Sequence, residues 1–543
     1  MLLRKRVLLA GAALGLLAFV VPGARAQFVQ QGGTLVGTGS SGKGTSAFNS
    51  EPCNNTAVVC APHEGFSVAI SGDGNTAVWG APGDSQGNGA VWVFTRSNGT
   101  WSQQGGKLVG TGANGPAGQG YTVAISGDGN TIIAGGPADD TTCANTSGCY
   151  GVGAVWVFTR SGSAWTQQGS KLVGTGYVPD LMGQVGQGTA VALSADGNTA
   201  IVGGPFDSPN SAPGANGSGA AWVFSLGSGV WTQQGGKLVT RDQVAGSSLV
   251  HSADVGSSVA ISADGNTAIV GGPYDANAVV NGATKVAGAA FVFTRSNGAW
   301  SQQGSKLVGT GQAAFVLAGS GVALSGDGNT ALVAGSTFYE YAQTSVFTRS
   351  NGVWTQQGSS LIGAAGPASL SADGNTALAG HSLYTRNNGL WTQAGSIPQS
   401  NASALSSDGN TAILGYPFSD DLGGVEVFVR GPANTPLATQ ASPSAGSATS
   451  QTFVFTFMDT SGYQNLTVVD ALINNFLDGR QACYVAFVPS GANSGSVFLV
   501  DNAGDAGGPY QGMLLPGSGT VQNSQCTIAG AGARCPATGI HSP

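Results

Sequence analysis

Aspartates that closely follow a proline are the acidic residues whose recurrence most suggests chemistry. They are Asp84, Asp139, Asp207, Asp275 and Asp420. Carboxylates gathered on one surface can attract a cation or a basic partner, and a pair in one pocket can act as acid and base. Solvated loop acids are the more common case. Both interpretations of these aspartates stay open at this point.

Other catalytic signals are missing from the sequence. The histidines His63, His251, His381 and His541 share no motif. The sequence contains no G-x-S-x-G elbow, no H-E-x-x-H and no phosphate loop. We therefore predict a protein that is not an enzyme, with polysaccharide cleavage by residues converging from separate repeats as the catalytic alternative.

The cysteines indicate an oxidising compartment. Cys53 lies close to Cys60 and Cys143 to Cys149, while Cys483 and Cys526 share the C-terminal region. The local pairs lack the C-x-x-C spacing and the nearby histidines of a zinc site. We predict disulfides for all three pairs and leave Cys535 unassigned.

Internal repeats determine the expected architecture. The motif D-G-N-T occurs seven times, and a second motif, an aromatic residue followed two positions later by Gln-Gln-Gly or Gln-Ala-Gly, also recurs seven times. In one unit, strands are expected at Ser67–Ser71, Thr76–Gly80, Ala90–Thr95 and Trp101–Val109. Turns rich in Gly, Asp and Asn separate these segments. Four antiparallel strands repeated in this way are typical of a β-propeller.

The two ends of the repeat region predict a closed ring. The segment that opens with Phe28 matches a fourth strand, with no first three strands before it. The last unit, from Ala402 to Arg430, has the first three strands and no fourth. Pairing the two would complete the last sheet and remove exposed strand edges. We expect an all-β fold: a seven-bladed propeller closed by its N-terminal strand.

The repeats resemble a known family. The string from Gly65 to Ile70, followed by Gly72-Asp73-Gly74 and Gly80-Ala81-Pro82, is similar to the FG-GAP repeats of integrin α-subunit propellers, and similar strings begin at Gly120, Gly188 and Gly256. The resemblance covers about Gln27 to Arg430. It implies a propeller that recognises a partner outside the cell.

The family often binds calcium in the turn between the first two strands. The alternating positions here are Ala69, Ser71, Asp73, Asn75 and Ala77. Calcium wants six to eight oxygen ligands, and this set supplies few. We expect no calcium and no other cofactor, and a turn in which Asp and Asn bond their own backbone.

The functional prediction is placed on the loops. Loops that follow the second and fourth strands should share one face, and their lengths vary widely, whereas the other turns are short and uniform. Variable loops on a rigid scaffold usually carry recognition. Tyr177, Tyr274 and Phe206 are the aromatic residues in these loops, and the repeated tryptophans should pack between blades. We predict binding or adhesion to an extracellular protein or glycan, with a structural envelope component as the alternative.

Composition and the N-terminus support export. The formal charge is −7 with charged residues at 8%. No basic stripe is present, which argues against nucleic acid. Arg4, Lys5 and Arg6 precede an apolar run from Val7 to Val21, and Ala24-Arg25-Ala26 suits a signal-peptide cleavage site. We expect a secreted or periplasmic monomer with no membrane span after cleavage.

The C-terminal region is predicted as a separate domain. Residues 1–26 are assigned to the signal peptide, 27–431 to the propeller, 432–450 to a linker without strands and 451–543 to the C-terminal domain. Alternating segments in the last part suggest a small immunoglobulin-like β-sandwich, complete or truncated, with one or two helical turns at Val469–Leu477 as an option.

Overall fold

The structure is a computed structural model that describes most of the repeat region and parts of both ends. The described residues are 2–5, 28–41, 61–140, 150–180, 182–208, 218–244, 253–275, 278–280, 283–285, 287–310, 317–336, 342–363, 367–419, 422–430, 437–442, 451–452, 454–458, 469–473, 483–491, 494–503 and 510–531. The chain divides into two compact units. One is Phe28–Val429, and the other combines Met1–Gln27 with Arg430–Pro543.

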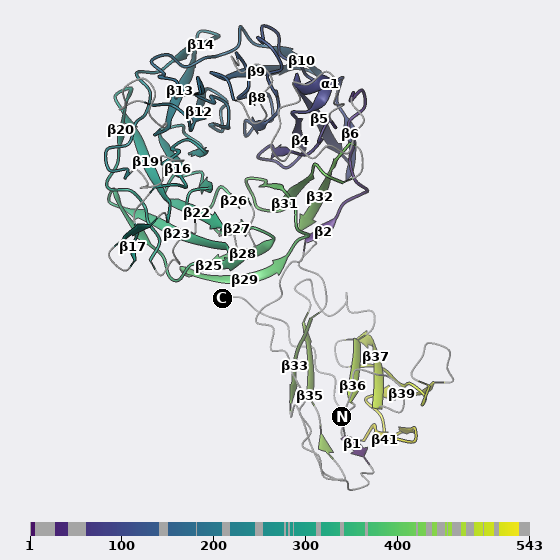
Figure 1. Cartoon of the computed structure of the whole chain (residues 1–543). Helices are drawn as coiled ribbons and strands as arrows, with labels where there is room; N and C mark the ends of the chain where they lie inside the picture. Colours follow the sequence, from purple (N-terminus) through teal and green to yellow (C-terminus); the bar gives the residue numbers. More distant parts are fainter. Residues whose placement is uncertain are drawn as a thin grey trace. The chain divides into compact units, whose positions relative to one another are not determined.

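Repeated four-stranded antiparallel sheets build the larger unit, so the fold is all-β and propeller-like (Figure 1). Sheet 1 contains β3 (Ser67–Ile70), β4 (Thr76–Ala81), β5 (Ala90–Ser97) and β6 (Thr100–Gln103). Sheet 2 contains β7 (Thr122–Ile125), β8 (Thr131–Gly136), β9 (Ala154–Ser161) and β10 (Ala164–Gln167). Sheet 3 contains β11 (Ala190–Leu193), β12 (Thr199–Gly204), β13 (Ala220–Gly227) and β14 (Val230–Gln233).

The later sheets repeat this order. Sheet 4 contains β15 (Ser258–Ile261), β16 (Thr267–Gly272), β19 (Ala289–Ser296) and β20 (Ala299–Gln302). Sheet 5 contains β21 (Gly321–Leu324), β22 (Thr330–Ser336), β23 (Ala342–Ser350), β24 (Val353–Gln356) and β25 (Leu361–Gly363). Sheet 6 contains β26 (Ala368–Leu370), β27 (Thr376–Ala379), β28 (Ser382–Asn387) and β29 (Leu390–Ser396). Between β16 and β19, β17 (Ala278–Val280) pairs with β18 (Ala283–Lys285).

Sheet 7 joins the two ends of the repeat region. It contains β30 (Ala402–Leu405), β31 (Thr411–Tyr416), β32 (Gly424–Arg430) and the N-terminal strand β2 (Phe28–Gln30), which pairs with β32. After β2 the ladder continues, because Gln31 N–H donates to the Val427 carbonyl at 2.8 Å and Leu35 bridges Val425.

Backbone hydrogen bonds also connect the sheets in a cycle. The residue that opens each turn between the first and second strands donates its N–H to the carbonyl of the same position in the next sheet, at 2.8–3.1 Å. The order is Gly72, Gly127, Ala195, Ala263, Gly326, Ala372, Ser407 and then Gly72 again. The first strands contact one another in the same order, and β30 contacts β3. These residues are small because the backbones approach closely: a Cβ on Gly72 would lie 2.9 Å from the Gly127 carbonyl oxygen.

Apolar side chains fill the spaces between neighbouring sheets. Trp156 of sheet 2 is fully buried against Val78, Val91 and Val93 of sheet 1. Trp222 of sheet 3 occupies the equivalent place against sheet 2. The prediction that these strand tryptophans pack between repeats is confirmed.

The fourth strands are shorter than the sequence indicates. β6 ends at Gln103, and pairing resumes only where Leu108 bridges Val91. Gly105 interrupts the strand because its φ is +77°, a left-handed conformation that favours glycine. Asp84–Gly87, labelled α1, is a short turn after β4 in which Ser85 and Gln86 have left-handed φ angles of 52° and 62°.

The smaller unit contains three sheets among its described residues. One has β36 (Val469–Ile473), β37 (Cys483–Gly491), β38 (Ser494–Leu499) and β39 (Gln511–Leu515). A second has β34 (Gln451–Thr452), β1 (Leu2–Lys5), β41 (Cys526–Ala529) and β40 (Thr520–Gln522). In the third, β33 (Leu437–Ser442) pairs with β35 (Val454–Met458).

Two expectations for this region are wrong. The segment predicted as a strandless linker contains β33, because the ladder with β35 outweighs its weak local strand preference. The optional helix at Val469–Leu477 is strand β36 at its start, paired with β37 from Val469 to Ile473. A core that includes Val485, Val497 and Ile528 draws side chains from two of the sheets.

Candidate functional site

The loops of the larger unit gather on two opposite faces. At five seams, a parallel bridge joins the residue before a third strand to a residue shortly before the first strand of the next sheet, as for Gly89 with Gln119 and Gly153 with Gln187. Loops that follow second and fourth strands therefore meet on one face, here called the loop face. The turns within the first and last strand pairs meet at the other end, where Arg96 donates to Asn75 at 3.0 Å.

The predicted site aspartates lie in the loop face, but they are buried and paired. Asp84, Asp139, Asp207 and Asp275 are each at most 1% exposed. Each carboxylate forms an ion pair with a lysine of its own sheet. The pairs are Asp84–Lys107, Asp139–Lys171, Asp207–Lys237 and Asp275–Lys306. The expectation of solvated acids that make the face negative is corrected for these residues, because the lysine neutralises each carboxylate. Asp420 lies outside the described residues.

Each of these carboxylates also ties down a loop from the preceding sheet. The second oxygen of Asp207 accepts the Val178 N–H at 2.7 Å, and Asp84 accepts the Ser41 N–H at 2.7 Å. Burial raises the pKa of Asp207 above its ordinary value, although the Lys237 and Val178 hydrogen bonds lower it. The four aspartates therefore fix the conformation of the loops that form the loop face.

The turn aspartates bond within their own turns, as predicted. Asp73 accepts hydrogen bonds from the Ser71 hydroxyl at 2.5 Å and from the Asn75 N–H and side-chain amide, both at 2.9 Å. Partial burial raises the Asp73 pKa, but these hydrogen bonds and the Arg96 charge lower it overall. The same arrangement recurs at Asp128, Asp196, Asp264, Asp327, Asp373 and Asp408. Among the described residues, no group of three or more His, Cys, Asp or Glu is arranged to hold a metal ion.

The face opposite the loop face is fastened by a repeated arginine network. Arg96 lies 5.3 Å from the Trp101 ring centroid and donates to Gln31 and Thr411 of the preceding sheet. The Trp101 indole N–H donates to the same Gln31 side chain at 3.1 Å. Equivalent arginines act at four further seams, Arg160, Arg295, Arg349 and Arg386. These arginine and tryptophan side chains are therefore engaged in holding neighbouring sheets together.

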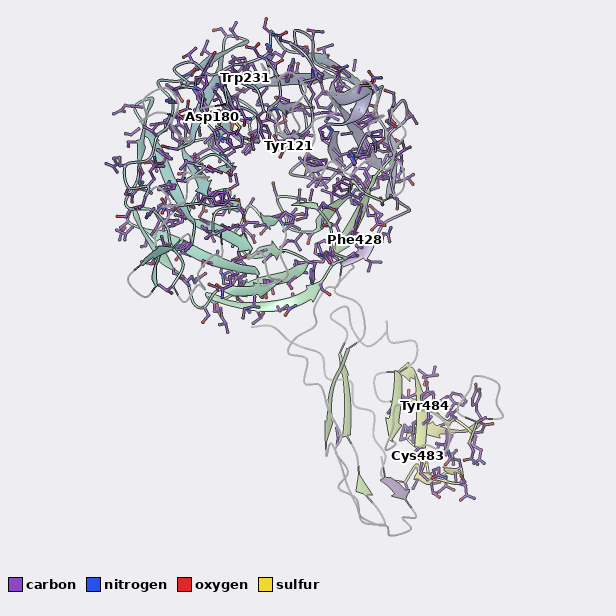
Figure 2. The ribbon with its side chains drawn as sticks, in the orientation of Figure 1. Tyr121, Asp180, Trp231, Phe428, Cys483 and Tyr484 are labelled. Atoms are coloured by element: carbon purple, nitrogen blue, oxygen red, sulfur yellow. A yellow bond between two sulfur atoms is a disulfide. The ribbon has the colours of Figure 1, made fainter. Side chains whose placement is uncertain are left out.

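A row of partly exposed aromatic side chains crosses the loop face over sheets 1 to 3. We call Phe66, Tyr121, Tyr150 and Phe206 the aromatic row. Successive ring centroids lie 5.0, 6.0 and 5.0 Å apart, and the two tyrosine hydroxyls are 2.9 Å apart. Figure 2 shows Tyr121 near the inner edge of the ring and Trp231 toward its rim.

An acidic pair lies on the same face at sheets 3 and 4. Asp254 is 8% exposed and precedes β15, with a φ of +51°. Burial, together with the charge of nearby Asp180, raises the pKa of Asp254 to about 7. Burial and the Asp254 charge raise the pKa of Tyr274. Two carboxyls and a tyrosine therefore influence one another beside the loops of sheet 3.

Sequence reasoning found only part of this surface. Phe206 and Tyr274 were expected among the loop aromatics, whereas Phe66, Tyr121, Tyr150 and Asp254 were missed. The signal was present for two of them, because Phe66 and Tyr121 each follow the glycine that precedes a first strand. Tyr177 is 36% exposed in the loop that also carries Asp180.

One predicted disulfide is confirmed. Cys483 of β37 and Cys526 of β41 are bonded with a Cα–Cα distance of 5.7 Å. Cys53, Cys60, Cys143 and Cys149 lie outside the described residues. Arg4 and Lys5 of the predicted signal peptide fall in β1, while its apolar run and cleavage site are outside the described residues. Among the helices of the described part, none is long and apolar enough to cross a membrane.

Comparison with known proteins gives matches to solved structures alone. No family model and no curated protein matches the chain, so the FG-GAP resemblance stays a hypothesis. A protein of Bacteroides uniformis assigned as a 6-phosphogluconolactonase is 14% identical, with 61% of this chain and 83% of that chain covered and a TM-score of 0.40. A protein of Bacteroides fragilis with the same assignment is 13% identical, with 61% and 82% covered and a TM-score of 0.38.

These matches correct one prediction. The expectation that the protein is not an enzyme is contradicted, because both similar structures carry an enzyme's name. At this identity and TM-score the likeness transfers no substrate and no catalytic residue to this chain.

Proposed function

We propose that the protein is an exported, closed seven-bladed propeller of FG-GAP type that binds an extracellular glycan or protein through its loop face. The aromatic row is the observation that carries the proposal. Four neighbouring rings from three sheets are partly exposed on one face. Aromatic rings with polar tips are favoured where a partner presents both apolar and hydroxylated surface.

The charges of the face favour an uncharged or basic partner. The lysines Lys107, Lys171, Lys237 and Lys306 are all engaged by buried aspartates. Asp254 and Asp180 add carboxyl oxygens to the loops at sheets 3 and 4 of the same face, and such oxygens accept hydrogen bonds from sugar hydroxyls or amines. A neutral glycan fits the rings and the carboxyls together, and a protein surface is the other outcome to test.

Export is the second part of the proposal. The Cys483–Cys526 disulfide suits an oxidising compartment. The basic N-terminus and apolar run that follow Met1 suit a cleaved signal peptide. We propose a secreted or periplasmic location and monomeric binding. The smaller unit is proposed to be a β-sandwich.

An array of glycans and matrix proteins, probed with residues 27–543, tests the binding. For any ligand found, Tyr121→Ala should weaken binding at least about tenfold, in the range of an interface hot spot. Tyr121→Phe retains the ring and should bind with a smaller loss. Leu390→Ala is the matched control, because Leu390 is 68% exposed at a turn of the opposite face.

The results of these binding assays distinguish a binding function of the loop face from the alternatives. Weakened binding by Tyr121→Ala with unchanged binding by Leu390→Ala supports the loop face. Equal binding by both variants would place the site elsewhere. Absence of any ligand on the array would favour the structural role in the envelope or matrix.

A further inference from the structure

A glutamine side chain closes the seam between neighbouring sheets at two places. The Gln119 carbonyl oxygen accepts the Gly110 N–H at 2.6 Å, and its amide donates to the Gly110 carbonyl at 2.9 Å. Gln187 forms the same two bonds with Gly174 at 2.6 and 3.0 Å. Both glutamines are at most 2% exposed. An amide suits this place because it offers one acceptor and one donor to a single peptide group.

Glu64 occupies the same place at the seam where the chain closes. Like Gln119 with Gly89, it forms a parallel bridge with the residue before a third strand, here Gly423 of sheet 7. One carboxyl oxygen, Oε2, accepts the Gly37 N–H at 2.5 Å and the Trp79 indole N–H at 3.1 Å. The other oxygen, Oε1, is buried with no hydrogen-bond partner among the described residues.

The unpartnered oxygen corresponds to the amide nitrogen of the glutamines. Gln119 uses that nitrogen to donate to a glycine carbonyl, and an ionised carboxylate has no proton to donate there. A protonated Glu64 has one. An unsatisfied buried oxygen costs free energy, so the geometry itself favours the neutral acid.

The surroundings of Glu64 act in the same direction. Burial raises its pKa above the ordinary value. The N–H groups of Gly37 and Trp79 and the nearby Ser40 hydroxyl, which donates to the Gly37 carbonyl at 3.4 Å, lower it, and the charge of Asp84 raises it again. Asp84 is itself paired with Lys107. His63, the neighbouring titratable group, lies with Nδ1 3.1 Å from the Pro417 carbonyl oxygen.

We propose that Glu64 is a neutral carboxylic acid that donates its proton to the Gly37 carbonyl, and that its ionisation loosens the N-terminal segment that closes the ring. Glu64 contacts the segment after β2, sheet 1 through Trp79, and sheet 7 through Gly423 and Leu422. Loss of its proton removes the bond to the Gly37 carbonyl and leaves a buried negative charge at the point where these three segments meet. Glu64 therefore holds the N-terminal segment more firmly at acidic pH than at alkaline pH.

The direction of the pH effect follows from linkage. The unfolded chain has an ordinary glutamate pKa, near ~4.3, and folding raises it. The stabilisation from Glu64 is therefore complete below the ordinary pKa and is lost as the pH rises through the folded-state pKa. A glutamine in its place would provide both hydrogen bonds at every pH.

Reciprocal substitutions test the proposal. Glu64→Gln should leave Tm unchanged at pH 4.5 and raise it by about 1–3 °C at pH 8.5. Gln119→Glu places the same group at an internal seam and should lower Tm at pH 8.5 more than at pH 4.5. Hydrogen exchange of the peptide covering residues 28–41, corrected for intrinsic rates, should rise with pH in the wild type and stay level in Glu64→Gln.

An infrared measurement and two possible contrary results complete the test. The infrared band of protonated carboxyls should be weaker in Glu64→Gln than in the wild type at acidic pH. If Glu64→Gln lowers Tm equally at both pH values, or if exchange of residues 28–41 has the same pH profile in both proteins, the proposal is wrong.

Discussion

At the residue scale, the sequence predicted the position of the buried aspartates correctly and their solvent exposure incorrectly. The sequence places Asp84, Asp139, Asp207 and Asp275 in the variable loops, and the structure agrees. Their burial depends on lysines 23 to 32 residues further along the chain. The sequence contained evidence for these ion pairs, because sheets 1 to 4 each contain both the aspartate and the lysine. The segment completing sheet 7 has Thr34 at the lysine position.

The two partners of an ion pair differ in burial, and this difference leads to a prediction. Asp207 is fully buried, whereas the Lys237 side chain is 14% exposed. Lys237→Met should cost about 3–5 kcal/mol at neutral pH, because it leaves an uncompensated buried carboxylate. Asp207→Asn should cost less, about 2 kcal/mol, since the lysine can reach water.

Urea unfolding of the larger unit at pH 5 and pH 8 measures both variants. Removal of Lys237 raises the folded-state pKa of Asp207 further, so the loss in Lys237→Met should shrink at the lower pH. Equal losses for the two variants, independent of pH, would show that the pair is not buried as described.

At the element scale, local periodicity was sufficient for most strands. The first three strands of each unit were predictable because alternation and D-G-N turns specify them locally. The fourth strand was overextended, since Gly105 reads as a turn only once its positive φ is known. β33 was missed because its strand character comes from β35, a partner that composition does not reveal.

A glycine that follows a fourth strand gives a second prediction. A Cβ on Gly110 would lie 2.0 Å from Trp156 Cδ1, a contact that forces the buried indole to move. Gly110→Ala should cost about 1–3 kcal/mol through overpacking. Gly106 is the matched control, because a Cβ there meets no atom within 4 Å.

Thermal unfolding of the two alanine variants provides the comparison. Gly106→Ala should keep the wild-type Tm, while Gly110→Ala should lower it and alter the Trp156 fluorescence. A wild-type Tm for Gly110→Ala would mean that the tryptophan is not packed against this backbone.

At the scale of the whole molecule, the candidate site exists only because the sheets are arranged in a cycle. Phe66, Tyr121, Tyr150 and Phe206 are far apart in the sequence, and neighbouring sheets bring them into one row. The sequence predicted that loops after second and fourth strands share one face, and the bridges between sheets agree; that this face binds a partner stays a prediction. It did not predict which side chains meet there, because that depends on the distances between sheets. Glu64 likewise has its role only at the seam between the first and last sheets.

Closure of the ring by the N-terminal segment is the claim on which the loop face and the aromatic row depend. Leu35 and Val425 exchange both backbone hydrogen bonds, at 2.7 and 3.0 Å. Residues paired in this way lie about 5.5 Å apart at Cα, a separation that a disulfide can bridge. Oxidation of the double variant Leu35→Cys, Val425→Cys should give an intramolecular crosslink in the monomer, seen by non-reducing electrophoresis and peptide mapping. A crosslink that forms only between molecules, or none in folded protein, would contradict the closed ring.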